Sequence, residues 1–327
     1  MTFTMTEASF GPYPVLDIEG GATRVLIALC GATVLSWNVH GVELVDGYAD
    51  EVEFAEQLGM RSAMMIPFSN RVDGGRYSFD GVEHDFNEGD ADNTGATVLH
   101  GLLRQTDFTL AAIELGESSA VIHLVTRALR PGTFAGYPFS VDVSIDVEIT
   151  ETSIQVTIEG TNTGETAAPF ASGWHPYFTI GTASVDELVL TVPADTRIVS
   201  DPDLIPLEGA AGRVPTAGEW DFREPRPIRD QALDVAFDDL SLAADGLAHS
   251  TITDPVSGRS IDVWQDRGLM HVFTADTVTR PRQSVALEPV EVMTNSLNRP
   301  EQADAIRLEP GERRSFRFGA TISMETP

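Results

Sequence analysis

The sequence contains no lysine and only one cysteine among its 327 residues. A lone cysteine cannot close a disulfide within the chain, which is typical of proteins in a reducing compartment. Cys30 lies in the apolar stretch RVLIALCGATV, where a small buried core residue is favoured over a reactive nucleophile.

Long hydrophobic runs are also missing. The first residues, MTFTMTEASFGPYPV, have neither the basic start nor the continuous apolar stretch of a signal peptide. No apolar run approaches the roughly 20 residues that span a bilayer. We therefore expect a cytoplasmic protein without a membrane partner.

Positive charge is scarce. Twenty-one arginines stand against 50 acidic residues, which gives a formal net charge of -29. Such a surface repels nucleic acid phosphates, so no nucleic acid partner is expected. A GC-rich genome would explain arginine in place of lysine. An acidic, halophile-like adaptation explains the acids directly. Molar salt shortens the Debye length to about 3 Å, so the repulsion between the many carboxylates is largely screened. A stability to unfolding that stays unchanged from low to molar KCl would contradict the halophile-like explanation.

Hydrophobic residues alternate with polar ones over long stretches. Residues 141–149 read VDVSIDVEI and residues 154–158 read IQVTI, each with the period of two that is typical of a half-buried strand. The two stretches are separated by a short polar break, which predicts an antiparallel pair. SFRFGATISM near the end of the chain predicts a further strand.

Turn signals separate the other strand-like stretches. Asp80-Gly81 in RYSFDGVEHDF predicts a hairpin, and TITDPVSGRSIDVWQ predicts another. Helical spacing is limited to a short stretch around VEFAEQLGM, and the Pro- and Gly-rich segment from Pro202 to Arg229 is expected to be a long surface loop. Together these patterns predict one all-β domain of stacked antiparallel sheets over residues 1–327.

Four segments place polar residues in apolar surroundings: IPFSNRVDGGRY, TVLHGLLRQTDF, APFASGWHPYF and VALEPVEVMTNSLN. Loops and strand ends that combine these residue types suit a sugar-binding site on a β scaffold. Glu288 in SVALEPV has apolar neighbours, and burial would raise its pKa from about 4.3 towards that of an effective base. The alternative is a structural glutamate paired with an arginine.

Histidine, amide and guanidinium groups complete the candidate set. His175 in SGWHPYF is a candidate proton donor, with flanking aromatic residues that suit a pyranose ring; the alternative is a core histidine, and His100 in VLHGLL presents the same choice. Asn70-Arg71 offers donors for sugar hydroxyls, or else a turn and a surface ion pair. Asp234 in ALDVAF is either an acceptor for hydroxyls or part of the acidic surface.

Other chemistries lack a pattern in the sequence. The seven histidines are scattered singly, unlike the clustered ligands of a metal site. Neither a phosphate-binding glycine loop, nor a nucleophile elbow, nor a dinucleotide fingerprint is present. No metal and no cofactor are expected.

Taken in order, these segments resemble the aldose 1-epimerase (galactose mutarotase) superfamily. The resemblance rests on PFSNRVDGGRYSFDG, LHG, GYPF at 136–139, HPYF and ALEP, which follow the family's order over nearly the whole chain. It implies a large antiparallel β-supersandwich and a small-molecule sugar as partner, in a monomer or homodimer. It also implies catalytic and substrate-binding roles for these residues: His175 as general acid, Glu288 as general base, and Asn70, Arg71, His100 and Asp234 as substrate ligands.

The function that the resemblance implies is that of an isomerase of carbohydrate metabolism, which interconverts the α and β anomers of a hexose or hexose derivative. The chain departs from the family pattern where HPYF continues with Thr179-Ile180 and where LHG is followed by LLRQTDF. Both features resemble less characterised branches, some of which act on hexose 6-phosphates, and Arg61 and Arg104 are candidate phosphate contacts. The alternatives are a mutarotase specific for a hexose 6-phosphate, a non-catalytic sugar-binding protein, and a glycoside-cleaving enzyme or lyase.

Overall fold

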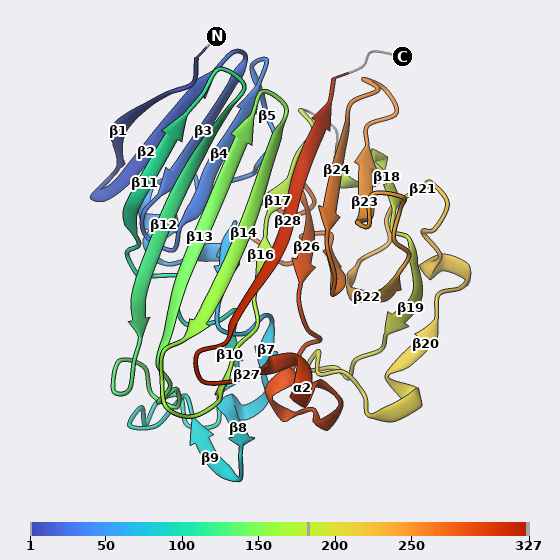
Figure 1. The fold of residues 1–327 in the computed structure, drawn as a ribbon. Helices are drawn as coiled ribbons and strands as arrows, with labels where there is room; N and C mark the ends of the chain where they lie inside the picture. Colours follow the sequence, from blue (N-terminus) through green and yellow to red (C-terminus); the bar gives the residue numbers. More distant parts are fainter. Residues whose placement is uncertain (1, 182–183, 325–327) are drawn as a thin grey trace.

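Antiparallel sheets make up most of the computed structural model, which describes residues 2–181 and 184–324 (Figure 1). The largest sheet has nine strands, in the spatial order β11 (Thr109–Leu115), β12 (Ser119–Leu129), β13 (Val141–Thr150), β14 (Ser153–Asn162), β28 (Arg313–Ser323), β24 (Ser260–Gln265), β23 (Ala248–Thr253), β18 (Val189–Thr191) and β21 (Arg226–Pro227). In Figure 1 the long strands β12, β13, β14 and β28 run side by side.

A second sheet has eight strands and carries three of the six predicted site residues, His175, Asp234 and Glu288. Its spatial order is β20 (Arg213–Pro215), β19 (Ala194–Ile198), β22 (Asp234–Leu240), β25 (Leu269–Phe273), β26 (Val285–Val290), β16 (Gly173–His175) and β6 (Ala63–Met65), and β17 (Tyr177–Phe178) also pairs with β26.

The N-terminal part forms a third sheet with its strands in chain order: β1 (Thr4–Phe10), β2 (Tyr13–Gly20), β3 (Thr23–Ala28), β4 (Thr33–Val39) and β5 (Val42–Glu43). Three two-stranded pairs complete the strands: β7 (Arg71–Val72) with β10 (Val98–Leu99), β8 (Arg76–Phe79) with β9 (Val82–Asp85), and β15 (Ala168–Pro169) with β27 (Arg307–Leu308).

Helices are short and lie between strands. The α-helices are α1 (Glu51–Ala55) and α2 (Ala303–Ile306), and the single 3-10 turns are η1 (Leu58–Met60), η2 (Asp73–Gly75), η3 (Val185–Glu187), η4 (Gly209–Ala211), η5 (Gly218–Trp220), η6 (Ser296–Asn298) and η7 (Pro300–Gln302). Over the described ranges, none of them has the length and apolar character needed to span a membrane.

The two large sheets face each other across an apolar core. The indole of Trp174 on β16 is fully buried and stacks on the ring of Phe318 on β28, with the ring centroids 5.7 Å apart. Along β13 every second residue is buried, so that strand places one face in this core. The packing of β16 against β28 confirms the predicted all-β sandwich of antiparallel sheets.

The strands that alternation and turn residues predict are present. β13 and β14 pair antiparallel with Val147 opposite Val156, and β8 and β9 form the hairpin closed by Asp80-Gly81. Asp80 and Gly81 both have positive φ, as a tight two-residue turn requires. The short helix expected around VEFAEQLGM corresponds to α1 and η1.

The expectation of one long loop from Pro202 to Arg229 is wrong in part. This segment contains β20 and β21, which pair with β19 and β18 at the outer edges of their sheets. Each of these strands ends in a proline, Pro215 or Pro227. Proline has no backbone N–H to donate and is therefore tolerated at a sheet edge, which is why the sequence pattern resembles that of a loop.

Candidate active site

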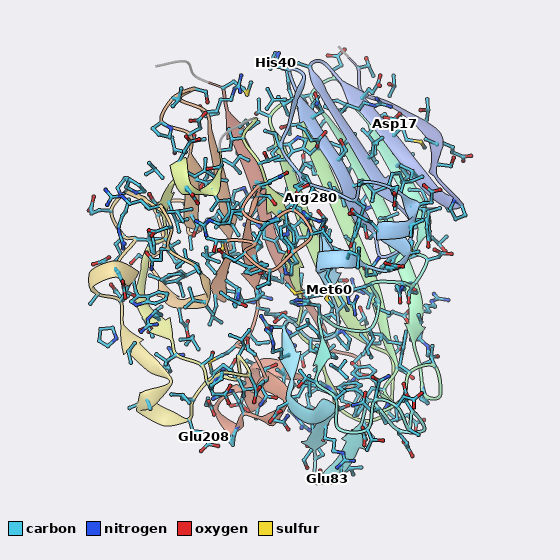
Figure 2. The ribbon with its side chains drawn as sticks, turned by 180° about the vertical axis from the view of Figure 1, so that it is seen from behind. Asp17, His40, Met60, Glu83, Glu208 and Arg280 are labelled. Carbon is cyan, nitrogen blue, oxygen red and sulfur yellow. The ribbon has the colours of Figure 1, made fainter. Side chains whose placement is uncertain are left out.

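All six residues predicted for the site line one cavity of about 190 Å³: Asn70, Arg71, His100, His175, Asp234 and Glu288. They come from five separate parts of the chain: His175, Asp234 and Glu288 lie on strands of the eight-stranded sheet, Arg71 lies on β7, and Asn70 and His100 lie in the loops beside β7 and β10. Met60 lies on the wall of this cavity, and Figure 2 shows it near the middle of the face seen from behind.

Strand alternation turns the candidate site side chains away from the core. Successive residues of a strand point to opposite faces. The neighbours Trp174, Leu287 and Val272 lie in the main core between the large sheets. His175, Glu288 and His271, each one position away, therefore point to the other face of the sheet, where the cavity lies.

Backbone conformation places the loop residues. Asn70 and His100 both have positive φ, 54° and 58°, which is uncommon for residues with a Cβ atom and indicates a conformation held by its surroundings. The N–H of His100 donates to the carbonyl oxygen of Asn70 at 2.9 Å, and Leu99 pairs with Arg71 between β10 and β7. These contacts bring the Asn70-Arg71 and Leu-His-Gly segments together.

Gly101 allows this close approach. Its φ is +75°, and a Cβ atom at this position would lie 2.3 to 2.6 Å from three backbone atoms of Ile66. We expect Gly101→Ala to reduce the free energy of unfolding by on the order of 3 kcal/mol, because both the clash and the backbone strain oppose the native loop. Denaturant unfolding measures the loss.

Gly81→Ala is the matched control for this prediction. Gly81 has a similar φ of +77°, but nothing lies within 4 Å of the added Cβ. Only the backbone cost of about 1 kcal/mol is expected there. Equal losses in the two variants would contradict the importance of the contact between Gly101 and Ile66.

His175 is held by two other rings. It stacks on Tyr177 at a centroid distance of 4.9 Å, and His100 meets it edge-on at 4.8 Å. Burial lowers the pKa of His175 to about 3, and the charge of His271 acts in the same direction. Its Nε2 lies 3.4 Å from Oε1 of Glu288.

Glu288 is a buried carboxylate whose side chain is 2% exposed. Burial raises its pKa to about 7, while the positive charges of His271 and Arg71 oppose that rise. Its Oε2 has no hydrogen-bond partner among the described residues. An oxygen without a protein partner is available to accept a hydrogen bond from a bound hydroxyl.

A histidine that was not singled out in the sequence, His271, completes the site. Its Nε2 lies 2.8 Å from Oδ1 of Asp234. Burial would lower the pKa of His271, but the charge of Glu288 and the hydrogen bond with Asp234 outweigh burial, and the pKa is raised. Its position in LMHVF, a polar residue inside an apolar strand, is the same signal that marks Glu288.

The aromatic residues around His175 differ from the expectation. Trp174 and Phe178 are fully buried in the core and cannot pack against a sugar in the cavity. The ring of Tyr177 does line the cavity, and its hydroxyl donates to the carbonyl oxygen of Gly59 at 2.9 Å. Alternation again explains the difference, because Tyr177 and Phe178 point to opposite faces.

Neither arginine suggested as a phosphate contact lines the cavity. Arg61 is 1% exposed, pairs with Asp46 and lies against the ring of Tyr177 at 4.7 Å from its centroid. Arg104 donates to the carbonyl oxygens of Leu99 and His100. Arg61 therefore uses one nitrogen for Asp46 and packs behind Tyr177, while Arg104 holds the backbone beside His100.

Two further observations bear on the location and chemistry of the site. A larger hollow of about 810 Å³ contains none of the predicted residues, and its two arginines, Arg280 and Arg282, are both paired with carboxylates. In residues 2–181 and 184–324, no three His, Cys, Asp or Glu side chains gather as a metal centre would require.

Comparisons with known proteins agree with the fold. The family model described as aldose 1-epimerase matches residues 14–321. The uncharacterized protein YihR of Escherichia coli strain K12 is 27% identical over 302 residues, 91% of this chain and 89% of that protein. The maltose epimerase of Levilactobacillus brevis is 24% identical over 298 residues, 86% of this chain and 84% of that protein. A galactose mutarotase-like protein from Clostridium acetobutylicum superposes with a TM-score of 0.84 over 99% of this chain and 98% of that one, at 15% identity.

Proposed function

Because the chain belongs to the aldose 1-epimerase family, we propose that it interconverts the α and β anomers of a hexose or hexose derivative. The observation that carries the proposal is the buried pair of Glu288 and His175, 3.4 Å apart and open to one cavity. A protein that only binds sugar has no need of two proton-transferring groups in contact, so the pair favours catalysis over the non-catalytic alternative.

The proposed reaction opens and recloses the sugar ring. Glu288 removes the proton of the anomeric hydroxyl, while Nε2 of His175 protonates the ring oxygen. The bond between C1 and the ring oxygen breaks, and the anomeric carbon becomes an aldehyde. After rotation about the C1–C2 bond, the hydroxyl formed from the ring oxygen attacks the other face of the aldehyde, and both proton transfers reverse. The site ends in its initial state, and nothing is consumed.

The reaction requires one proton on the pair. With a pKa of about 3 for His175 and about 7 for Glu288, the pair holds a single proton between these values. In the empty site that proton resides mainly on Glu288; transfer to His175 gives the reactive form without changing the total. Asn70, Arg71, His100 and Asp234 are proposed to hold the hydroxyls of the sugar.

Anomer exchange followed by NMR magnetisation transfer tests the proposal. Glucose, galactose, their 6-phosphates and maltose make a suitable panel. Maltose is included because the relatives include a maltose epimerase. The 6-phosphates test whether Arg71, the one guanidinium group that lines the cavity among the described residues, is enough to bind a phosphate. We expect at least one neutral sugar to exchange faster in proportion to protein concentration. Sugar binding by folded protein without faster exchange would instead favour the non-catalytic role.

The rate should depend on pH through the proton of the pair. We expect kcat/KM to be level between about pH 5 and pH 6 and to fall roughly tenfold per unit above about pH 7, because Glu288 and His175 then lose their shared proton. Initial rates from pH 5 to 9, corrected for spontaneous exchange, measure this. A rate that rises through neutrality to a plateau at pH 9 would show that the proton-free pair is active.

A further inference from the structure

His271 lies between two carboxylates. On β25 it is directly opposite Glu288 of β26 in the antiparallel register, which places their Cβ atoms about 5 Å apart on the same face. On the other side, β22 places Asp234 within hydrogen-bond distance of its Nε2, at 2.8 Å. One imidazole therefore connects a proposed substrate ligand to the proposed base.

The charges that face His271 come from every element around it. The negative groups are Asp234 of β22 and Glu288 of β26, and the positive or titratable groups are Arg71 of β7, His175 of β16 and His100 of the loop after β10. The two acids outweigh burial and Arg71, which raises the pKa of His271 above its ordinary value. By contrast, burial lowers the pKa of His175 and His100.

We propose that His271 is a positioning residue which stays protonated in the working enzyme and, anchored by Asp234, sets the pH range over which Glu288 and His175 keep their shared proton. This inference rests on the proposed function, since it concerns how that pair is tuned. It assigns to Asp234 a second task besides binding a hydroxyl.

The physical basis is the effect of one positive charge on two neighbours. An imidazolium beside Glu288 favours the ionised carboxylate, and it also disfavours a second positive charge on His175. Both effects lower the affinity of the Glu288–His175 pair for its shared proton. Asp234 keeps the ring in place and stabilises its charge, much as a carboxylate orients a histidine in other acid–base sites.

His271→Gln removes the charge and keeps a group that can donate to Asp234. We expect the alkaline midpoint of the kcat/KM profile to move up by about one pH unit, because the pair then binds its proton more tightly. His249→Gln is the matched control, since His249 also contacts aspartates, at 2.7 and 3.0 Å, but lies on β23 and does not line the cavity. An alkaline midpoint that stays in place or moves down in His271→Gln would overturn the inference.

A direct measurement separates this inference from the proposed function. Nitrogen-15 NMR of the histidine side chains should show His271 mainly doubly protonated at pH 6.5 in the intact protein and clearly less protonated in Asp234→Asn. A neutral His271 in a protein that accelerates anomer exchange would overturn the inference alone. Absence of exchange with every sugar would overturn the proposed function, while the NMR result would still report the charge of His271.

Discussion

Glu288→Gln is expected to slow anomer exchange by at least about 100-fold, because a positioned base contributes about 10²- to 10⁴-fold and an amide cannot take the proton of a hydroxyl. Glutamine has nearly the same shape, so contacts with bound sugar should largely remain. The loss should therefore appear in kcat much more than in KM. NMR magnetisation transfer with the best sugar of the panel measures it.

The same variant carries its own control for folding. The pKa of Glu288 is raised by burial, so the folded protein favours the protonated acid and loses stability as pH rises through about 7. Replacement by neutral glutamine removes this penalty. Glu288→Gln should thus raise the unfolding midpoint more at pH 8 than at pH 5. Near-normal turnover in a stably folded variant would eliminate Glu288 as the base.

His175→Asn should also reduce exchange by about 100-fold or more, since it removes the proposed donor to the ring oxygen. Asparagine can still donate a hydrogen bond but cannot transfer a proton. Its shorter side chain also loses the stack on Tyr177. The rate measured at saturating sugar distinguishes lost proton transfer from weaker binding.

His100→Asn is the informative comparison, because the two histidines are in edge-to-face contact 4.8 Å apart. If His100 binds a hydroxyl and His175 transfers the proton, His100→Asn should raise KM with a smaller effect on kcat. The opposite pattern, with His175→Asn active and His100→Asn inactive, would assign the acid to His100.

The fold was predictable because its strands alternate strictly over stretches longer than a turn. β13 and β14 show this most clearly, since each buries every second residue. β20 and β21 were not predicted, because edge strands of two or three residues that end in proline have neither the length nor the period of a half-buried strand.

The sequence alone determined the set of polar residues in apolar surroundings, and with the family resemblance it predicted six of the residues that line the cavity. It could not determine which of their neighbours share that cavity. His271 and Asp234 are 37 residues apart and become partners only through the pairing of β25 with β22. Trp174 and Phe178, adjacent to the site in sequence, belong to the core because a strand turns successive side chains to opposite faces.

Proton affinities were likewise a property of the tertiary structure. Local sequence indicated that Glu288 is buried, but its pKa depends on the charges that other strands bring to it. His271 and Arg71 act on the carboxylate from separate parts of the chain, in addition to the effect of its burial. Composition and periodicity thus indicated the long alternating strands, while strand register decided which side chains meet, because electrostatic interactions depend on distance in space and not on separation along the chain.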